Sequence, residues 1–281
     1  MSNIHIVIDS TCNVPAEMLA AYPNLHVVNL KIMLGSDEWN EPEISCDELF
    51  KLVKEKGIFP RTSQPPLGEF SQAFAQAGDN TPIIVIAVSG GISGTVNGAR
   101  AVAKDYKDRE IYVIDSSTVS IGVIKMAEKA FQLAEEGKSA ASIAHYLERM
   151  VEATRTLLIP DTLEFLHKGG RIGGAAALFG SILQIKPLLN LQEGKVQVLE
   201  KVRTRSRAIN RMLDELNNYK DIEYIGIGHG AAPDVAEEIY NTLSQRYPGV
   251  PVSISVIGSA VGAHTGPGVV GLIFQTKIAD C

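Results

Sequence analysis

The side chains best placed for chemistry in this sequence are Ser93 and Thr95, two hydroxyls in the glycine-rich loop 89–95. The apolar, β-branched run 83–88 before the loop predicts a strand that is buried on both faces. Residues 96–103 after the loop can start a helix. A strand that turns through small residues into a helix N-terminus presents free backbone N–H groups to an anion. The loop therefore predicts an anion site, although Ser93 can equally act only as a helix cap.

Better-known phosphate loops do not fit this segment. It has no Gly-Lys-Ser/Thr, which excludes a Walker A loop, and its glycines do not follow the dinucleotide-binding order. Residues 91–95 come close to the Gly-x-Ser-x-Gly elbow of hydrolases but end in threonine.

Composition limits the class of protein. The chain has 281 residues, 45% of them apolar and 21% charged, which predicts a globular protein with two domains. The net charge of −6 argues against general nucleic-acid binding. Cys12, Cys46 and Cys281 lack metal-ligand spacing, so we expect no metal site and a reducing compartment. With no signal peptide before a first strand near Ile4 and no apolar run of membrane-spanning length, we expect a cytoplasmic protein.

Alternating strands and helices up to about residue 155 predict a parallel sheet with helices on both faces. Residues 7–10 and 113–116 share the sequence Val-Ile-Asp-Ser at the ends of two predicted strands. These Asp-Ser pairs either line a ligand crevice at the carboxyl edge of the sheet or cap the segments that follow. We expect residues 25–34 to form one strand and residues 36–42 a surface loop.

The composition changes near Thr156, where we expect a second α/β domain with a mixed sheet to begin. The proposed domains are 1–155 and 156–281, with the final segment free to return to the first. Residues 175–185 are apolar nearly all round, which predicts a helix that is either buried or covers an apolar ligand. Residues 258–268, around His264, carry four glycines and a proline and are expected to form a loop.

Eight short motifs occur in one order along the chain and resemble the DegV family of bacterial fatty-acid-binding proteins, also called FakB-type. The likeness covers essentially the whole chain and implies a two-domain α/β protein. The motifs are Val7-Ile8-Asp9-Ser10, Thr62-Ser63-Gln64-Pro65, Ser93-Gly94-Thr95, Asp115-Ser116, Gly169-Gly170-Arg171-Ile172, Ile185-Lys186-Pro187, Val202-Arg203-Thr204 and His264-Thr265-Gly266-Pro267-Gly268.

The resemblance implies that the protein holds one long-chain fatty acid in a closed apolar tunnel and uses no other cofactor. Its carboxylate would lie near Thr62, Ser93 and His264, close to the helix start at Gly94 and Thr95. A separate kinase subunit would phosphorylate the carboxylate, and the acyl phosphate would enter phospholipid synthesis. This chain would then be a carrier without catalytic residues, with transient contact at a membrane surface allowed.

Two arginines match motif positions that the family associates with kinase docking or phosphate handling, Arg171 and Arg203. Both can also be ordinary solvated surface charge. One departure from the family pattern is Ser89-Gly90, which stands where a Ser-Ser pair is common, so hydrogen bonding to the head group is expected to differ in detail.

The chemistry of the residues agrees with a fatty acid. A tail of roughly 14 methylenes, at about 0.8 kcal/mol each, offers on the order of 11 kcal/mol if the tunnel excludes water. The segment 175–185 is a candidate wall of that tunnel. A buried carboxylate needs partners, and hydroxyls at Thr62 and Ser93 with N–H groups at the helix start can supply them without a fixed cation.

The alternative is a serine hydrolase of lipid esters that uses Ser93. The order of Ser93, Asp161 and either His229 or His264 matches that of α/β-hydrolases. Against it, the last glycine of the elbow is missing. A transcription factor is disfavoured by the acidic charge and by the lack of a helix-turn-helix or zinc pattern.

Overall fold

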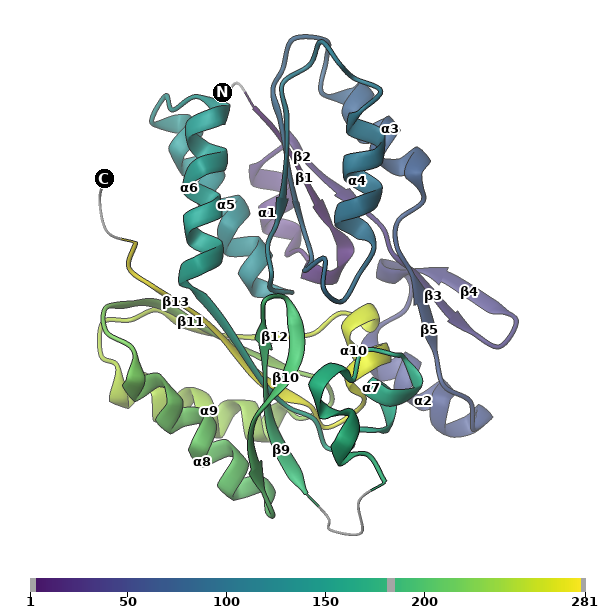
Figure 1. The fold of residues 1–281 in the computed structure, drawn as a ribbon, viewed down its shortest axis with the longest axis vertical. Helices are drawn as coiled ribbons and strands as arrows, with labels where there is room; N and C mark the ends of the chain where they lie inside the picture. The colour runs from purple at the N-terminus through teal and green to yellow at the C-terminus, as the bar shows by residue number, and fades with distance from the viewer. Residues whose placement is uncertain (1–3, 181–184, 279–281) are drawn as a thin grey trace.

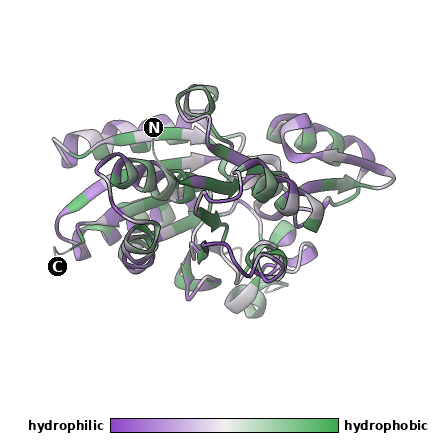
Figure 2. Cartoon of the chain, turned by 90° about the horizontal axis from the view of Figure 1, so that it is seen from above, coloured by the Kyte–Doolittle hydropathy of each residue, from purple (hydrophilic) through white to green (hydrophobic). Residues whose placement is uncertain are grey.

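The computed structural model describes residues 4–180 and 185–278, which fold around two main β-sheets and a smaller third one (Figure 1). The strands at the centre of the molecule carry the most apolar residues, whereas the helices alternate between apolar and polar positions (Figure 2). Within the described ranges, no helix combines the length and the apolar character that crossing a bilayer would require.

The first sheet is parallel, with strand order β2-β1-β6-β7. Alternate residues of its central strands enter two different cores. Ile6 and Ile84 pack toward α5 and α6, whereas Val7 and Val85 pack toward α3 and α4. Figure 1 shows these two pairs of helices on opposite sides of the sheet. This double burial is the physical reason for the continuous apolar runs, and it confirms the predicted parallel sheet with helices on both faces. The elements are β1 (His5–Asp9), η1 (Ser10–Cys12), α1 (Ala16–Ala21), β2 (Leu25–Val28), α3 (Leu67–Gln76), β6 (Ile83–Ala87), α4 (Thr95–Ala103), β7 (Ile111–Asp115), α5 (Ile121–Glu135) and α6 (Ala140–Ala153).

The expectation of a single strand over 25–34 is wrong, because the chain changes sheets within it. The N–H groups of Asn29 and Leu30 donate to the side chains of Glu69 and Ser10, so no strand ladder continues there. The chain then enters an antiparallel sheet of order β4-β3-β5, and part of the expected loop 36–42 is a strand of it. These elements are β3 (Lys31–Leu34), β4 (Asp37–Asn40), η2 (Glu41–Glu43), α2 (Cys46–Lys56) and β5 (Arg61–Ser63).

The second main sheet is mixed, with strand order β10-β9-β8-β13-β11-β12. One face packs on α8 and α9 through residues such as Leu157, Ile225 and Phe274. The final strand pairs with β8 and β11 and so belongs to this sheet. The elements are β8 (Thr154–Ile159), β9 (Lys186–Gln192), β10 (Lys195–Val202), α8 (Arg205–Glu215), η4 (Leu216–Asn218), β11 (Ile222–His229), α9 (Pro233–Arg246), β12 (Val252–Val256) and β13 (Val270–Thr276).

The segment 258–268 is not only a loop, because α10 (Ser259–Thr265) lies within it. Its start is held from far away in sequence: the Glu41 carboxylate accepts a hydrogen bond from the Ala260 N–H at 2.9 Å. A cap supplied from 219 positions away leaves no local signal in the sequence.

The expected helix over 175–185 is also wrong in its described part. α7 (Glu164–Lys168) is followed by η3 (Gly173–Leu178), which buries Ala175 and Leu178 and is a short 3₁₀ turn. Residues 181–184 lie outside the described residues, and strand β9 begins at Lys186. None of residues 175–180 lines the central cavity, so this part of the predicted tunnel wall is not where we expected it.

We propose the division into domains 1–155 and 156–281. Every strand of the parallel sheet precedes residue 116, and every strand of the mixed sheet follows Ala153. Ile278 returns to the core of the first half, where it packs among residues of β1, α5 and α6.

Candidate functional site

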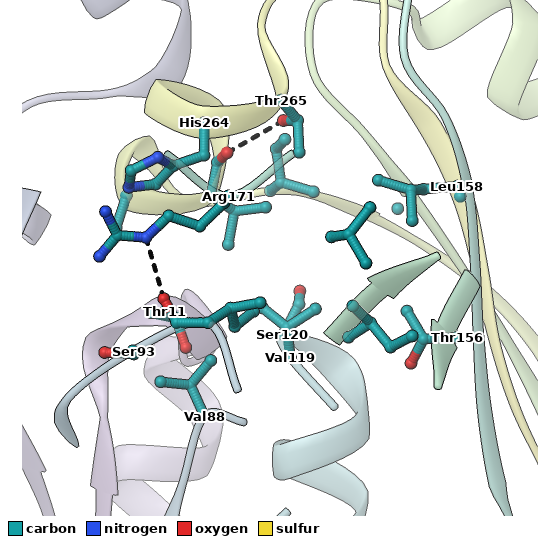
Figure 3. Close-up of a pocket in the computed structure, with 18 of the residues that line it drawn as sticks. Thr11, Val88, Ser93, Val119, Ser120, Thr156, Leu158, Arg171, His264 and Thr265 are labelled. Carbon is teal, nitrogen blue, oxygen red and sulfur yellow. Dashed lines mark hydrogen bonds between the residues drawn. The ribbon is translucent and has the colours of Figure 1, made fainter. Parts of the chain in front are cut away.

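A cavity of about 250 Å³ lies between the carboxyl edge of the parallel sheet and the face of the mixed sheet that α8 and α9 leave uncovered (Figure 3). Val88 and Ile92 border it from the end of β6, and Val261 and Thr265 border it from α10. Its walls are mainly apolar. The other apolar residues that line it are Leu30, Val119, Ile121, Leu157, Leu158, Leu166, Leu191, Val196, Ile257, Ala260, Val269 and Ile273.

Polar side chains gather at one end of this cavity. Thr62 on β5, Ser93 after β6 and His264 on α10 line it there, and Thr62 Oγ1 is hydrogen-bonded to His264 Nε2 at 2.8 Å. Figure 3 places Ser93, Arg171 and His264 together, whereas Thr156 and Leu158 lie at the opposite end. The arrangement gives a long apolar ligand one polar terminus.

Ser93 contacts the start of α4 without being its N-cap, which is Gly94. Its Oγ lies 2.8 Å from Thr95 Oγ1 and accepts a hydrogen bond from the Thr95 N–H at 3.3 Å. It also lines the cavity beside Gly94, whereas Thr95 is buried behind it.

His264 is neutral in this site. Burial and the positive charge of Arg171 lower the pKa of His264 to about 4. Its Nδ1 atom is buried with no hydrogen-bond partner, and it faces Gly169 so closely that a Cβ at that position would overlap it. A neutral imidazole and two hydroxyls form a polar end that an anion can enter without displacing an existing salt bridge.

Arg171 is better anchored than its position beside glycines suggests. Its Nε donates to the Ile92 carbonyl at 3.0 Å and its Nη1 donates to the Gly169 carbonyl at 2.7 Å. The side chain therefore contacts the loop after β6 and places a positive charge at the polar end of the cavity.

A surface groove of about 600 Å³ lies beside the polar end and shares Ser93, Gly94 and Arg171 with the cavity. Arg171 and Lys195 supply its charged side chains, and no carboxylate lines it among the described residues. Much of the remaining wall is backbone, because the groove is lined by Gly90, Gly91, Gly94, Gly170, Gly173 and Gly174.

The repeated Asp-Ser pairs hold the glycine-rich loop from two sides. Asp9 accepts hydrogen bonds from the N–H groups of Val88 and Thr11, at 2.6 and 3.1 Å. Asp115 accepts from the N–H groups of Gly90 and Ser117, both at 3.0 Å. Neither aspartate lines the cavity. Each aspartate therefore holds the backbone at the start of the glycine-rich loop, and each also accepts a hydrogen bond from the segment that directly follows it in sequence.

Gly90 of the Ser89-Gly90 pair leaves little room for a side chain. A Cβ there would lie 2.6 Å from Asp115 Oδ2. The neighbouring Ser89 is buried and donates to the Gly194 carbonyl at 2.7 Å, which joins the loop to the turn between β9 and β10.

Comparison with known proteins identifies the family. The family model of the DegV proteins, described as uncharacterised proteins, matches residues 3–277. The chain belongs to the DegV family. It is 32% identical to Protein DegV of Bacillus subtilis, over 98% of this chain and all of that protein. It is 31% identical to a DegV domain-containing protein of Clostridium perfringens, over 98% of this chain and 99% of that protein.

Solved DegV structures match the whole fold. The crystal structure of Bacillus subtilis DegV, described as a fatty acid binding protein, aligns with a TM-score of 0.89 at 31% identity. That alignment covers 99% of this chain and 100% of the other. A DegV family protein from Thermus thermophilus, described by its fatty acid binding, aligns with a TM-score of 0.89 at 30% identity, over 98% and 99% of the two chains. These matches confirm the DegV-like α/β fold.

Five of the expected DegV site residues converge at the cavity: Thr62, Ser93, Gly94, Arg171 and His264. Arg203 does not. It is exposed beyond the end of β10, whereas the other end of that strand reaches the loop at Gly91. At about 3.3 Å per residue, the strand carries Arg203 roughly 30 Å from Gly194.

Sequence reasoning missed several residues of this DegV cavity. Gln64 lines it and packs so closely on Gly94 and Gly98 that a side chain at either glycine would crowd it. Thr11 lines it from the end of β1, where the carboxyl-edge rule could have found it. Within the part of the chain that the structure describes, no cluster of three metal-ligating side chains exists, so the structure offers no candidate for a metal site.

The arrangement does not assemble the triad of the hydrolase alternative. Ser93 is hydrogen-bonded to Thr95, and His264 is hydrogen-bonded to Thr62. Asp161 instead pairs with Lys186 and Arg205 outside the cavity. His229 uses its Nδ1 to accept the Ala232 N–H.

Proposed function

We propose that this chain binds one long-chain fatty acid in its central cavity and presents the carboxylate to a fatty acid kinase subunit. The kinase forms an acyl phosphate, which then enters phospholipid synthesis. In this proposal the chain is a cytoplasmic carrier that supplies no catalytic residue, needs no other cofactor and makes at most transient contact with a membrane surface.

The observation that carries the proposal is a mainly apolar cavity in which Thr62, Ser93, Arg171 and His264 gather at one end. Each methylene removed from water contributes about 0.8 kcal/mol, so an apolar cavity rewards a long tail. The two relatives described as fatty acid binding, at 30% and 31% identity, support the same ligand class.

The polar end suits a carboxylate that must later be released. Thr62 and Ser93 offer hydroxyl donors, and neutral His264 offers a ring whose pKa a nearby anion raises. Arg171 supplies long-range positive charge while its Nε and Nη1 are committed to backbone carbonyls. A carboxylate held this way avoids the tight bidentate pair that would oppose phosphoryl transfer.

The groove beside Ser93 and Arg171 supports access from outside. A phosphoryl donor held by the kinase can approach the carboxylate along this groove, whose glycine backbone and two cations suit phosphate oxygens. Arg203 lies too far away to touch the head group, which favours a role in docking an extended partner surface over a role in phosphate handling.

Binding is tested by denaturing the purified protein and identifying the released lipid by mass spectrometry. We expect one fatty acid per chain, with lower occupancy in Ser93→Ala. A protein that never carries or takes up a fatty acid would overturn the proposal. A covalent adduct of Ser93 with a fluorophosphonate probe would support the hydrolase instead.

Presentation is tested with fatty-acid-loaded protein, the kinase subunit and ATP. We expect Arg171→Ala and Arg203→Ala to keep fatty-acid binding within about threefold and to lower the rate of acyl phosphate formation at least tenfold, because each removes a cation from the partner-facing surface. The control is Lys107→Ala, an exposed cation distant in sequence from both motifs. Parallel loss of binding and phosphorylation in both arginine variants would count against the docking role.

A further inference from the structure

On the face of the mixed sheet that borders the cavity, several positions are occupied by glycine and so carry no side chain. In the register of the sheet, Gly228 on β11 lies opposite Gly271 on β13, and Gly226 lies opposite Ile273. Residues two apart on a strand point to the same face, so Gly226 and Gly228 share the face that α8 and α9 do not cover. The missing side chains leave a trough along this face.

The trough is open at Gly228 and closed at Gly226. Gly228 and Gly271 both line the cavity and keep some exposed surface, although β11 and β13 are interior strands. Gly226 is fully covered, because a methyl carbon of Ile121 lies 2.6 Å from where its Cβ would stand.

Ile121 is held firmly in this covering position. It is the first residue of α5 and packs with Tyr224, Ile273 and Val119 in a small core of its own. The residue before it, Ser120, occupies the N-cap position with a φ of +53°, a backbone conformation that non-glycine residues seldom adopt, and its side chain makes no capping hydrogen bond. This turn brings the first turn of α5 over the sheet, and Ile121 also borders the cavity.

The covered end of the trough is the end distant from Ser93 and His264. Thr156 pairs with Ile273 in the same row of the sheet as Gly226. In Figure 3, Thr156 lies across the cavity from Ser93 and His264. A ligand whose carboxylate contacts the polar end therefore ends its tail near Gly228, against Ile121.

We propose that Gly228 and Ile121 set the length of acyl chain that the protein accepts, with Gly228 providing the last free space and Ile121 acting as the stop. This inference rests on the proposed fatty-acid binding. Gly228 is the position where volume can be added without disturbing the sheet. A Cβ there would meet only Ile257 Cγ2, at an ordinary 3.4 Å, whereas a Cβ at Gly271 would lie 2.6 Å from the Leu157 carbonyl oxygen.

The test measures dissociation constants of delipidated protein for saturated fatty acids from ten to twenty carbons. Affinity rises about fourfold for each methylene that enters the cavity and stops rising where the tail meets the stop. We call the chain length at which affinity stops rising the break. We expect Gly228→Val to move the break to chains two to three carbons shorter, and to weaken the binding of chains longer than the new break by about fiftyfold. We expect Ile121→Ala to move the break about two carbons longer, because it uncovers Gly226.

Two control variants change the same residue types away from the cavity. Gly68→Ala adds a methyl at an exposed position with no atom within 4 Å, and Ile254→Ala shortens an exposed side chain on β12. Both should keep the break of the wild-type protein. If Gly228→Val fails to fold, Gly228→Ala, which should shift the break by about one carbon, and Ile121→Ala decide the question.

The outcomes separate the two proposals. If the wild-type protein binds none of these fatty acids, the proposed function is wrong, and so is the proposal that Gly228 and Ile121 set the chain length. If the wild-type protein binds them and the break is unchanged in both the Gly228 and Ile121 variants, these two residues do not set the chain length, although the protein does bind fatty acids.

Discussion

Thr62 Oγ1 and His264 Nε2 form a hydrogen bond of 2.8 Å between residues that are 202 positions apart in the chain. Thr62 comes from β5 of the small sheet, and His264 comes from α10, which packs on that sheet and on α2. The pair spans the proposed division of the chain and fixes both side chains at the polar end of the cavity. The geometry of the head-group site thus depends on how the two halves of the chain meet.

Replacement of Thr62 by valine should weaken fatty-acid binding about five- to tenfold, because it removes a hydroxyl donor and leaves His264 Nε2 without its partner. Calorimetric titration with palmitate gives the change in affinity. Thr242→Val, which alters an exposed threonine on α9, should leave the affinity unchanged. Equal affinity in Thr62→Val and the wild-type protein would exclude this hydroxyl from the head-group site.

Fatty-acid binding should be coupled to protonation of His264. In the empty protein, burial and Arg171 lower the pKa of His264 to about 4. A bound carboxylate adds negative charge beside the ring and raises this pKa, so in a range above about pH 4 the complex binds a proton that the empty protein does not. Binding should therefore take up protons in that range and strengthen as the pH falls from 7.

Calorimetry in two buffers of different ionisation enthalpy measures this proton uptake. The His264→Gln protein supplies the baseline, because it keeps the titration of the fatty acid itself and lacks the imidazole. The same uptake in both proteins would show that His264 does not respond to the ligand.

The sequence reveals the parts of this protein that depend on local patterns. Continuous apolar runs such as Ile83–Val88 predict the parallel sheet because both faces of those strands are covered. Thr62, Ser93 and His264 are found because each belongs to a short motif with a fixed neighbourhood. The match to Bacillus subtilis DegV bears out the fold that these motifs imply.

The sequence conceals what depends on distant contacts. At the start of α10 the Glu41 carboxylate accepts a hydrogen bond from the Ala260 N–H, and the residues near position 260 give no sequence signal for this contact. Arg171 looks unsupported between glycines until the Ile92 carbonyl is brought to it by the fold. The trough at Gly228 appears only when the register places Gly271 opposite it.

Replacement of Gly169 by alanine should damage the head-group site without adding a polar or charged group. A Cβ at this position would overlap His264 Nδ1, so the ring must move and its hydrogen bond with Thr62 must lengthen or break. We expect about tenfold weaker fatty-acid binding, similar to the loss in His264→Ala. The control is Gly68→Ala, which has open space around the new methyl.

A double-mutant cycle distinguishes this mechanism from general destabilisation. If Gly169→Ala acts by displacing His264, the double variant Gly169→Ala/His264→Ala should bind no more weakly than His264→Ala alone. Additive losses would indicate that Gly169 affects binding by a route that does not involve the ring.

Ionisation of Glu41 should lower the stability of the protein as the pH rises. Burial raises the pKa of Glu41 from its ordinary 4.5 to about 7, although Ser10 and the Ala260 N–H donate hydrogen bonds to it. Between these two pKa values the folded state keeps a proton that the unfolded chain has released, so the free energy of unfolding falls as pH rises from 4.5 to about 7 and then levels off. Glu41→Gln removes this titration, and its stability relative to the wild-type protein should improve across that range.

Denaturant titrations at several pH values measure the difference between the two proteins. The control is Glu43→Gln, two positions along the chain, where the exposed carboxylate has its pKa lowered by hydrogen bonds from Asn40 and so has no titration in this window. A constant difference between Glu41→Gln and the wild-type protein from pH 4.5 to 8 would mean that Glu41 titrates normally. Because Glu41 holds the start of α10, a more stable Glu41→Gln protein should also keep His264 in place and bind fatty acid with unchanged affinity at neutral pH.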